Sequence, residues 1–297
     1  MLTIKLLDCN HFNQLSNFLY LNQESSLFML SNLEQGGMID QGKIYQASYF
    51  ASINDNQIQG VVSHTWTGML LLQAPYDAVS IANFIKTHNS RRLITGIAGP
   101  WLQVAQIGKV WGLFNWRNSV VSKELIFSLQ FNNFIGGKYL LHNFNNNNRI
   151  TYRKANFEDL NFLVSWQIGF ENEIYRKRKK TKSVVLVRQQ LEKIIAQEKI
   201  RLLFSEDKPL SMITFNAQLS NAVQIGGVYT VPSHRNYGFA RTLITMSLLE
   251  VYQRGINQVI LTTNQDNLTA QSVYQSLGFR QIGEYGFIFF SENCCRD

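Results

Sequence analysis

An apolar strand, a proline, a polar loop containing glycine and an amphipathic helix follow one another without a break over residues 228–254, and no other stretch constrains the fold as tightly. The strand and loop read VYTVPSHRNYGFA over residues 228–240. Pro232 cannot continue a strand ladder, so the strand ends there. One face of the helix carries small or apolar residues at helical spacing, namely Ala240, Leu243, Ile244, Ser247, Leu248 and Val251. A strand that feeds a helix in this way indicates a mixed α/β fold.

The loop between this strand and this helix is suited to binding an anion. Gly238 allows the backbone to come close to a ligand, and the helix that follows presents free N–H groups at its positive end. This geometry fits a pyrophosphate, and Arg235 would add positive charge. The same residues could also form a tight strand-to-helix turn that holds no ligand.

A second pattern follows the helix. A strand over Val259–Thr263 leads into a short helix that opens at Asn267 and closes at Leu277-Gly278-Phe279. Asn267 is a good helix N-cap. Tyr274 shares a helical face with Ala270 and Leu277, so a core aromatic is the structural alternative for it.

The chain as a whole divides into two halves that show the same order of elements. The segment HNFNNNNR over residues 142–149 suits a linker, and it predicts a domain break near residue 147. Both halves read as three or four antiparallel strands followed by alternating helices and strands. In the first half we expect strands at 46–53, 59–66, 68–73, 93–98 and 124–130 and helices at 78–88 and 101–110. In the second half we expect strands at 151–154, 200–205, 210–216, 224–230, 259–263 and 286–290 and helices at 158–173, 184–197, 237–254 and 267–277.

Composition narrows the class of protein. The 297 residues are enough for two domains, and the formal charge of +8 favours partners that carry phosphate. Cys9, Cys294 and Cys295 follow no metal-ligand spacing, and so few cysteines suit a reducing compartment. Because no signal peptide and no membrane-spanning run is recognisable, we expect a cytoplasmic protein without a metal, bound to neither membrane nor nucleic acid.

The two patterns together resemble the GNAT superfamily of N-acetyltransferases. The resemblance rests on Arg-x-x-Gly-x-Ala after a strand that ends in proline, and on Asn-x-x-Ala-x-x-x-Tyr-x-x-x-Gly-Phe downstream. It covers residues 150–290. The fuller strings GGVYTVPSHRNYGFA and NQDNLTAQSVYQSLGF are similar to the glycine N-acyltransferase-like branch, in which a degenerate copy of the fold comes first.

This resemblance implies two tandem GNAT-like domains, each a mixed, mainly antiparallel sheet flanked by helices. Residues 1–147 would be the degenerate domain and 148–297 the catalytic one, because the first half lacks an Arg/Gln-x-x-Gly-x-Gly/Ala loop. Gly96–Pro100 sits roughly where such a loop would fall. The first domain would be a scaffold for the acceptor pocket or for a dimer interface, so homodimerisation stays open.

The resemblance also implies the site residues for acetyl-CoA. The pantetheine arm would lie along Val228, Tyr229 and Thr230, and Asn267 would contact that arm or a nearby water. Tyr274 would be the general acid that protonates the departing thiolate. The pyrophosphate would be held by the loop residues Arg235, Asn236, Tyr237, Gly238, Phe239 and Ala240.

One departure from the family concerns the general base. Many relatives carry a glutamate on the strand before the loop, but residues 223–227 read VQIGG. A water held by backbone carbonyls, or less readily Glu173, would then accept the proton. The structural alternative for Glu173 is a solvated carboxylate at the end of a helix. The basic run Arg176–Lys180 reads as a solvated loop or as a site that attracts an anion.

The function expected from the sequence is therefore acetyl transfer from acetyl-CoA to the primary amine of a small molecule. A non-catalytic acetyl-CoA sensor with the same fold is the alternative.

Overall fold

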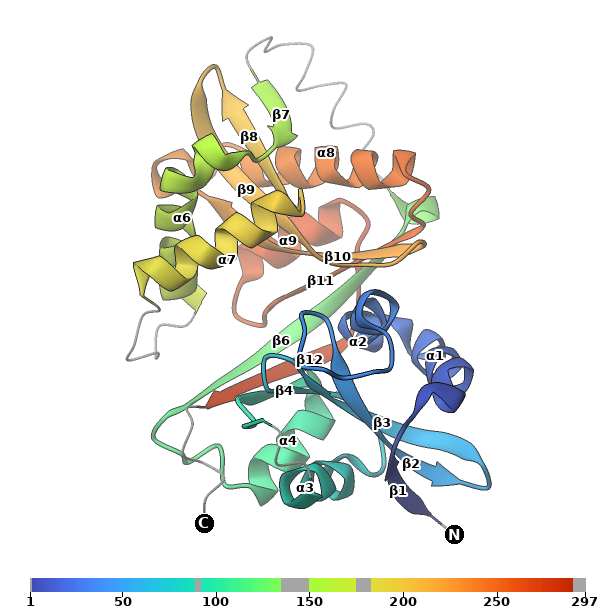
Figure 1. The fold of residues 1–297 in the computed structure, drawn as a ribbon. Coiled ribbons are helices and arrows are strands. Elements are labelled where there is room, and N and C mark those ends of the chain that lie inside the picture. Colours follow the sequence, from blue (N-terminus) through green and yellow to red (C-terminus); the bar gives the residue numbers. More distant parts are fainter. Residues whose placement is uncertain (1, 89–91, 135–149, 175–182, 291–297) are drawn as a thin grey trace. The chain divides into compact units, whose positions relative to one another are not determined.

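The computed structural model describes residues 2–88, 92–134, 150–174 and 183–290. The chain divides into two compact units (Figure 1): Met1–Ile126 with Ile282–Asp297, and Phe127–Gln281. This division differs from the predicted break near residue 147. Segment 142–149 lies outside the described residues, and the assignment of a degenerate and a catalytic domain stays a prediction.

The first unit begins with a strand, two helices and an antiparallel meander. In chain order the elements are β1 (Thr3–Leu6), α1 (Phe12–Leu21), α2 (Gln23–Gly36), β2 (Ala47–Asn54), β3 (Gln57–Thr65), β4 (Met69–Gln73), α3 (Ala78–His88), β5 (Gly96–Pro100), α4 (Trp101–Val110) and β6 (Ser119–Gln130). The pairs β2–β3 and β3–β4 are antiparallel, so the predicted meander is confirmed. The sequence patterns gave no indication of β1, α1 or α2.

The core of this unit forms between its sheet and the helices α3 and α4. The strand order is β1-β2-β3-β4-β5-β12-β6, in which β12 covers Arg280–Phe290. Strands β4 and β5 are parallel. Ile81 and Ile85 of α3 and Ile107 of α4 are fully buried against apolar strand residues such as Leu70 and Ile97. The apolar face of α3 follows the helical spacing that predicts it, which is why its limits agree with the sequence.

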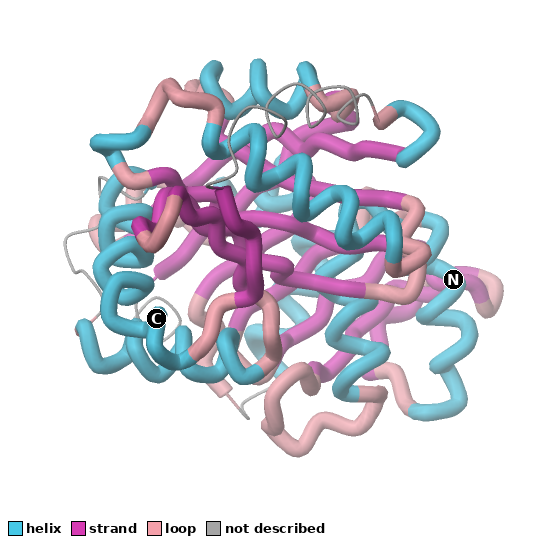
Figure 2. The backbone as a smooth tube through the Cα atoms, turned by 90° about the horizontal axis from the view of Figure 1, so that it is seen from above, coloured by secondary structure: helices cyan, strands magenta, loops and turns pink. Residues whose placement is uncertain are grey.

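The rest of the chain repeats the same order of elements. They are β7 (Ile150–Lys154), α6 (Leu160–Ile174), α7 (Val184–Ala196), β8 (Ile200–Ser205), β9 (Lys208–Gln218), β10 (Ala222–Thr230), α8 (Phe239–Gln253), β11 (Gln258–Asn264), α9 (Leu268–Ser276) and β12 (Arg280–Phe290). The strand order is β6-β11-β10-β9-β8-β7. The helices and strands can be followed along the backbone in Figure 2.

Helices cover both faces of the sheet in the second unit. Successive residues of a strand point to opposite faces. On β8, Leu202 belongs to the apolar core formed with α6 and α7, which also contains Met212 of β9 and Tyr229 of β10. The preceding residue, Arg201, points the other way and hydrogen-bonds Glu250 of α8. One face of the sheet therefore carries α6 and α7, and the other carries α8.

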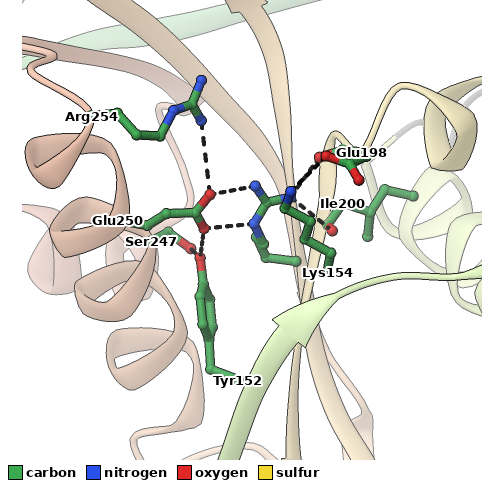
Figure 3. A network of polar contacts seen from close by, with 8 residues as sticks. Tyr152, Lys154, Glu198, Ile200, Ser247, Glu250 and Arg254 are labelled. Atoms are coloured by element: carbon green, nitrogen blue, oxygen red, sulfur yellow. Dashed lines mark hydrogen bonds and ion pairs between the residues drawn. The ribbon is translucent and has the colours of Figure 1, made fainter.

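A buried ion pair fixes α8 on its face of the sheet (Figure 3). Arg201 Nε lies 2.6 Å from Glu250 Oε2, and the same oxygen accepts a hydrogen bond from the Tyr152 hydroxyl at 2.6 Å. Only 3% of the Arg201 side chain is exposed. Arg254 lies 3.8 Å from the other Glu250 oxygen. These contacts join β7, β8 and the C-terminal half of α8.

The element order occurs twice, from β1 to β6 and from β7 to β12, and the last strands of these two copies are exchanged. In the first copy the strand after α4 is β6, yet β5 pairs antiparallel with β12, from Tyr285 opposite Pro100 to Phe289 opposite Gly96. In the second copy the strand after α9 is β12, yet β11 has β6 as its neighbour. Residues Ile282–Phe290 therefore belong to the first compact unit, which explains why the two units differ from the predicted domains.

The repeat also corrects the position expected for a degenerate loop. Gly96–Pro100 is strand β5, which follows α3 rather than preceding it. The segment of the first unit that corresponds to 231–238 is instead residues 74–77, between β4 and α3.

Candidate functional site

A fork opens between the two parallel strands of the second unit. The paired residues are Ala222 with Gln258, Val223 with Val259 and Gln224 with Ile260. Pairing ends there, although β10 continues to Thr230 and β11 to Asn264. The β11-facing edge of Val228–Thr230 is therefore available to an extended ligand, which could add to β10 as a further strand would.

The loop after β10 leads into the first N–H groups of α8. Gly238 is the N-cap of α8 and adopts the left-handed conformation at φ 81° and ψ 1°, without a side-chain capping bond. A Cβ at Gly238 would meet nothing within 4 Å, so backbone conformation rather than space requires glycine there. The first N–H groups of a helix have no partner within it, and the first turn of α8 carries no acidic residue. This loop has the local geometry of an anion site.

Arg235 makes three contacts at the mouth of the fork. Its Nε donates to the Thr230 carbonyl at 3.0 Å, and its guanidinium lies 5.5 Å from the centre of the Tyr229 ring. Its Nη2 forms an ion pair of 2.7 Å with Glu173 of α6. The sequence assigned Arg235 to the cofactor and Glu173 weakly to proton transfer, but it did not indicate that the two residues pair.

The side chain of Tyr229 points away from the fork, toward α6. Its ring packs against Trp166 and Phe170. A Cβ at Gly169 would lie 2.8 Å from the Tyr229 hydroxyl, so α6 needs a glycine at this point. Only the backbone of Tyr229 is then free to face a ligand, in the way that the sequence resemblance implied.

Asn267 and Tyr274 both have structural roles in α9. Asn267 is the N-cap, and its Oδ1 accepts a hydrogen bond from the Ala270 N–H at 3.1 Å. Tyr274 is buried, with its ring centre 5.9 Å from that of Phe127 and 6.0 Å from that of Phe279. The cap and the core packing that the sequence left as alternatives are therefore present, and the roles of both residues toward acetyl-CoA stay predictions.

The first unit has no loop of this kind between its corresponding strand and helix. The connection from β4 to α3 spans only residues 74–77, half the length of 231–238. It ends in Asp77, whose carbonyl accepts the N–H of Ile81 at the start of α3. A carboxylate at this helix N-terminus disfavours a second anion.

Two further sequence features fall elsewhere. The basic run 176–180 and the pair Cys294–Cys295 lie outside the described residues.

Within the described ranges, no three His, Cys, Asp or Glu side chains come together in a way that could hold a metal ion. The helices of the same ranges are all too short or too polar to cross a bilayer.

Comparison with known proteins agrees with this geometry. Residues 164–279 match the Acetyltransferase (GNAT) family, a range that contains the fork, the loop and α9. Mycothiol acetyltransferase of Catenulispora acidiphila is 40% identical over 58 residues, which are 18% of each chain. Human N-acetyltransferase 8 is 32% identical over 65 residues, 22% of this chain and 29% of that protein. The chain thus matches less than a third of either curated relative.

Solved structures extend the likeness to the whole chain. A Drosophila protein aligns with a TM-score of 0.67 at 11% identity, covering 98% of this chain and 99% of the other. A tandem GNAT protein from the clavulanic acid biosynthesis pathway aligns with a TM-score of 0.56 at 10% identity, covering 98% of both chains. The chain therefore has a two-domain GNAT fold. The similarity to the family at the level of sequence covers residues 164–279.

Proposed function

We propose that this protein is an acetyl-CoA-dependent N-acetyltransferase that acts on the primary amine of a small molecule. The observation that carries the proposal is the fork between β10 and β11, which leads directly into the Arg235–Ala240 loop. The second unit would be catalytic. The first would be a scaffold, because its corresponding loop is short and ends in Asp77.

The described residues fit acetyl-CoA in two ways. The open edge of Val228–Thr230 would pair with the amide groups of the pantetheine arm. The N–H groups from Asn236 to Ala240 would hold the pyrophosphate, and Arg235 would turn from Glu173 toward it. With the pyrophosphate at the loop, the arm would extend back along β10 toward Gln224, where the fork closes.

Acetyl-CoA supplies an acetyl thioester, whose C–S bond breaks as the amine nitrogen bonds to the acetyl carbon. Tyr274 would donate its hydroxyl proton to the departing sulfur and recover a proton from solvent. The amine loses one proton to water, because β10 offers no carboxylate. The products are then an acetamide and free CoA. That the chain belongs to the glycine N-acyltransferase-like branch is part of this proposal.

The cofactor site can be tested with two glycines at opposite ends of α8. Gly238 has φ 81° and Gly255 has φ 79°, and a Cβ at either would meet nothing within 4 Å. An aspartate therefore strains the backbone equally at both. Only Gly238→Asp puts a carboxylate where the pyrophosphate would bind, so it should abolish acetyl-CoA binding in calorimetry while Gly255→Asp retains it. Equal affinity in both variants would refute this cofactor site.

Turnover separates the enzyme from the sensor alternative. Wild-type protein is incubated with acetyl-CoA and an equimolar mixture of amino acids, polyamines and amino sugars, and the products are identified by mass spectrometry. An acetylated amine that forms only with active protein supports the enzyme. Tight binding of acetyl-CoA without any product would instead support the sensor.

A further inference from the structure

Two irregularities in the pairing of β9 with β10 lie where the fork closes. Gln224 pairs with Ala217 and Ile225 with Phe215, so Asn216 is an extra residue on β9. Gly226 then pairs with Thr214, but Tyr229 pairs with Met212, so β10 carries one extra residue in turn. Bulges of this kind re-aim side chains and are frequent beside active sites.

These bulges gather three neutral polar side chains around two glycines; we name Thr214, Asn216 and Gln224 the bulge site. A Cβ on Gly226 would lie 2.6 Å from Asn216 Nδ2 and 3.7 Å from Gln224 Nε2. A Cβ on Gly227, which has φ +59°, would lie 3.2 Å from Thr214 Oγ1. Because glycine has no side chain, Gly226 and Gly227 leave room for these three polar side chains.

The bulge site lies on the face of the sheet that α6 and α7 cover elsewhere. Ile200 belongs to the core formed with those helices and pairs with Thr214, which in turn pairs with Gly226. Paired residues share a face, so the bulge site continues the surface that carries Tyr229. Asn216 is exposed and Thr214 is half-buried, so the outer side of the bulge site faces solvent, while Gln224 lies at its buried end.

Gln224 carries a polar atom that the described part of the chain leaves unused. The residue is 5% exposed, and its Oε1 is buried without a hydrogen-bond partner among the described residues. A buried acceptor without a donor costs free energy, and such groups are rare in native proteins. A carboxamide oxygen needs an N–H or O–H donor, so the missing partner is a donor from outside the described chain.

We propose that the bulge site binds the acceptor amine, with the amine N–H donating to Gln224 Oε1. This assignment rests on the proposed function. The carboxamide is not a base, so Gln224 holds the amine and does not take its proton. Asn216 and Thr214 offer N–H and O–H donors beside it, which suits an amine whose neighbouring group accepts hydrogen bonds, such as an amino acid or an amino alcohol.

The test compares two buried glutamines on adjacent strands. Gln258 of β11 is 7% exposed, but its carboxamide donates to Ser128 Oγ at 2.9 Å. Gln224→Met removes an acceptor that lacks a partner and keeps the side-chain length, so its melting temperature should equal or exceed that of the parent. Gln258→Met breaks an internal hydrogen bond and should melt lower.

In steady-state kinetics, by contrast, Gln224→Met should be the more impaired of the two variants. With the amine that the wild type acetylates best, Gln224→Met should lower kcat/KM about tenfold, mainly through KM, while the Kd for acetyl-CoA is unchanged. Gln258→Met should leave the KM for the amine at the parent value.

The outcomes separate this inference from the proposed function. If Gln224→Met keeps the parent kcat/KM, or melts clearly lower than the parent, the bulge site is not the amine site and the proposed function stands. If the wild type acetylates no amine of the mixture, the proposed function fails and the bulge site assignment fails with it.

Discussion

Arg235 and Glu173 form an ion pair of 2.7 Å between the loop that precedes α8 and the end of α6. The arginine that would contact the pyrophosphate thus already has an anionic partner in the protein itself. Both side chains are partly exposed, so solvent screens the pair and it contributes little to stability. Acetyl-CoA would have to displace Glu173 from Arg235.

Replacing Glu173 by glutamine should therefore strengthen the binding of acetyl-CoA. The expected gain is at most about fivefold, because an exposed ion pair contributes no more than that. Calorimetry at low salt measures it, and the gain should shrink at high salt. Glu198→Gln removes an exposed carboxylate that pairs with Lys154 and should leave the affinity unchanged. A loss of turnover in Glu173→Gln without tighter binding would instead support Glu173 as the general base.

The role of Tyr274 can be separated from its packing by Tyr274→Phe. Phenylalanine keeps the ring contacts with Phe127 and Phe279 but cannot donate a proton. Turnover should fall by roughly 10²-fold with the acetyl-CoA affinity nearly intact. Tyr285→Phe is the matched control, because Tyr285 is a buried tyrosine of the other compact unit. Full activity of Tyr274→Phe with a normal thermal melt would exclude Tyr274 as the acid.

The sequence predicted those elements that depend on residues close together in the chain. The limits of α3 and α4 agree with the sequence because their buried faces repeat at helical spacing. The turn into α8 is as expected, since Pro232 ends the ladder and Gly238 adopts the positive φ that glycine tolerates. Asn267 caps α9 as its residue type favours.

Relationships between distant residues could not be predicted in this way. The pairing of β5 with β12 joins residues 96–100 to 285–289, and both strands read as ordinary buried strands. The bulges opposite Gln224 depend on the register of two strands, which hydrophobic alternation does not determine where glycines interrupt it. Tyr152, Arg201 and Glu250 are brought together only by the packing of α8 on the sheet.

The strand exchange predicts that a residue near the C-terminus stabilises the first unit. Ile288 of β12 is fully buried in the core around α3 and α4. Ile288→Ala should cost about 2–5 kcal/mol, the usual range for this truncation in a core. Hydrogen exchange should show the loss in β4 and β5. Ile282→Ala changes a residue of the same strand that is 41% exposed and should have little effect. Faster exchange confined to the second unit would argue against the exchanged strand.

The last prediction concerns Glu250 in acid. Burial by itself would raise the pKa of Glu250, but the hydrogen bonds from Arg201 and Tyr152 outweigh burial and lower the pKa below its ordinary value of 4.5. A lowered pKa stabilises the folded state above pH 4.5, and this contribution is lost as the pH falls through the folded-state pKa. Glu250→Gln leaves the buried Arg201 charge without its carboxylate.

Urea unfolding at pH 7 should therefore show that Glu250→Gln is less stable than the parent by roughly 3 kcal/mol, the low end for a broken buried ion pair, because glutamine keeps some hydrogen bonds. At pH 3 the difference should shrink, because this pH lies below 4.5, where Glu250 takes up a proton more readily in the unfolded parent than in the folded one. Glu284→Gln provides the control, because its partner Lys123 and Glu284 itself are both partly exposed. That variant should stay within about 1 kcal/mol of the parent. A difference between Glu250→Gln and the parent that is the same at both pH values would mean that the charge of Glu250 does not hold α8 to the sheet.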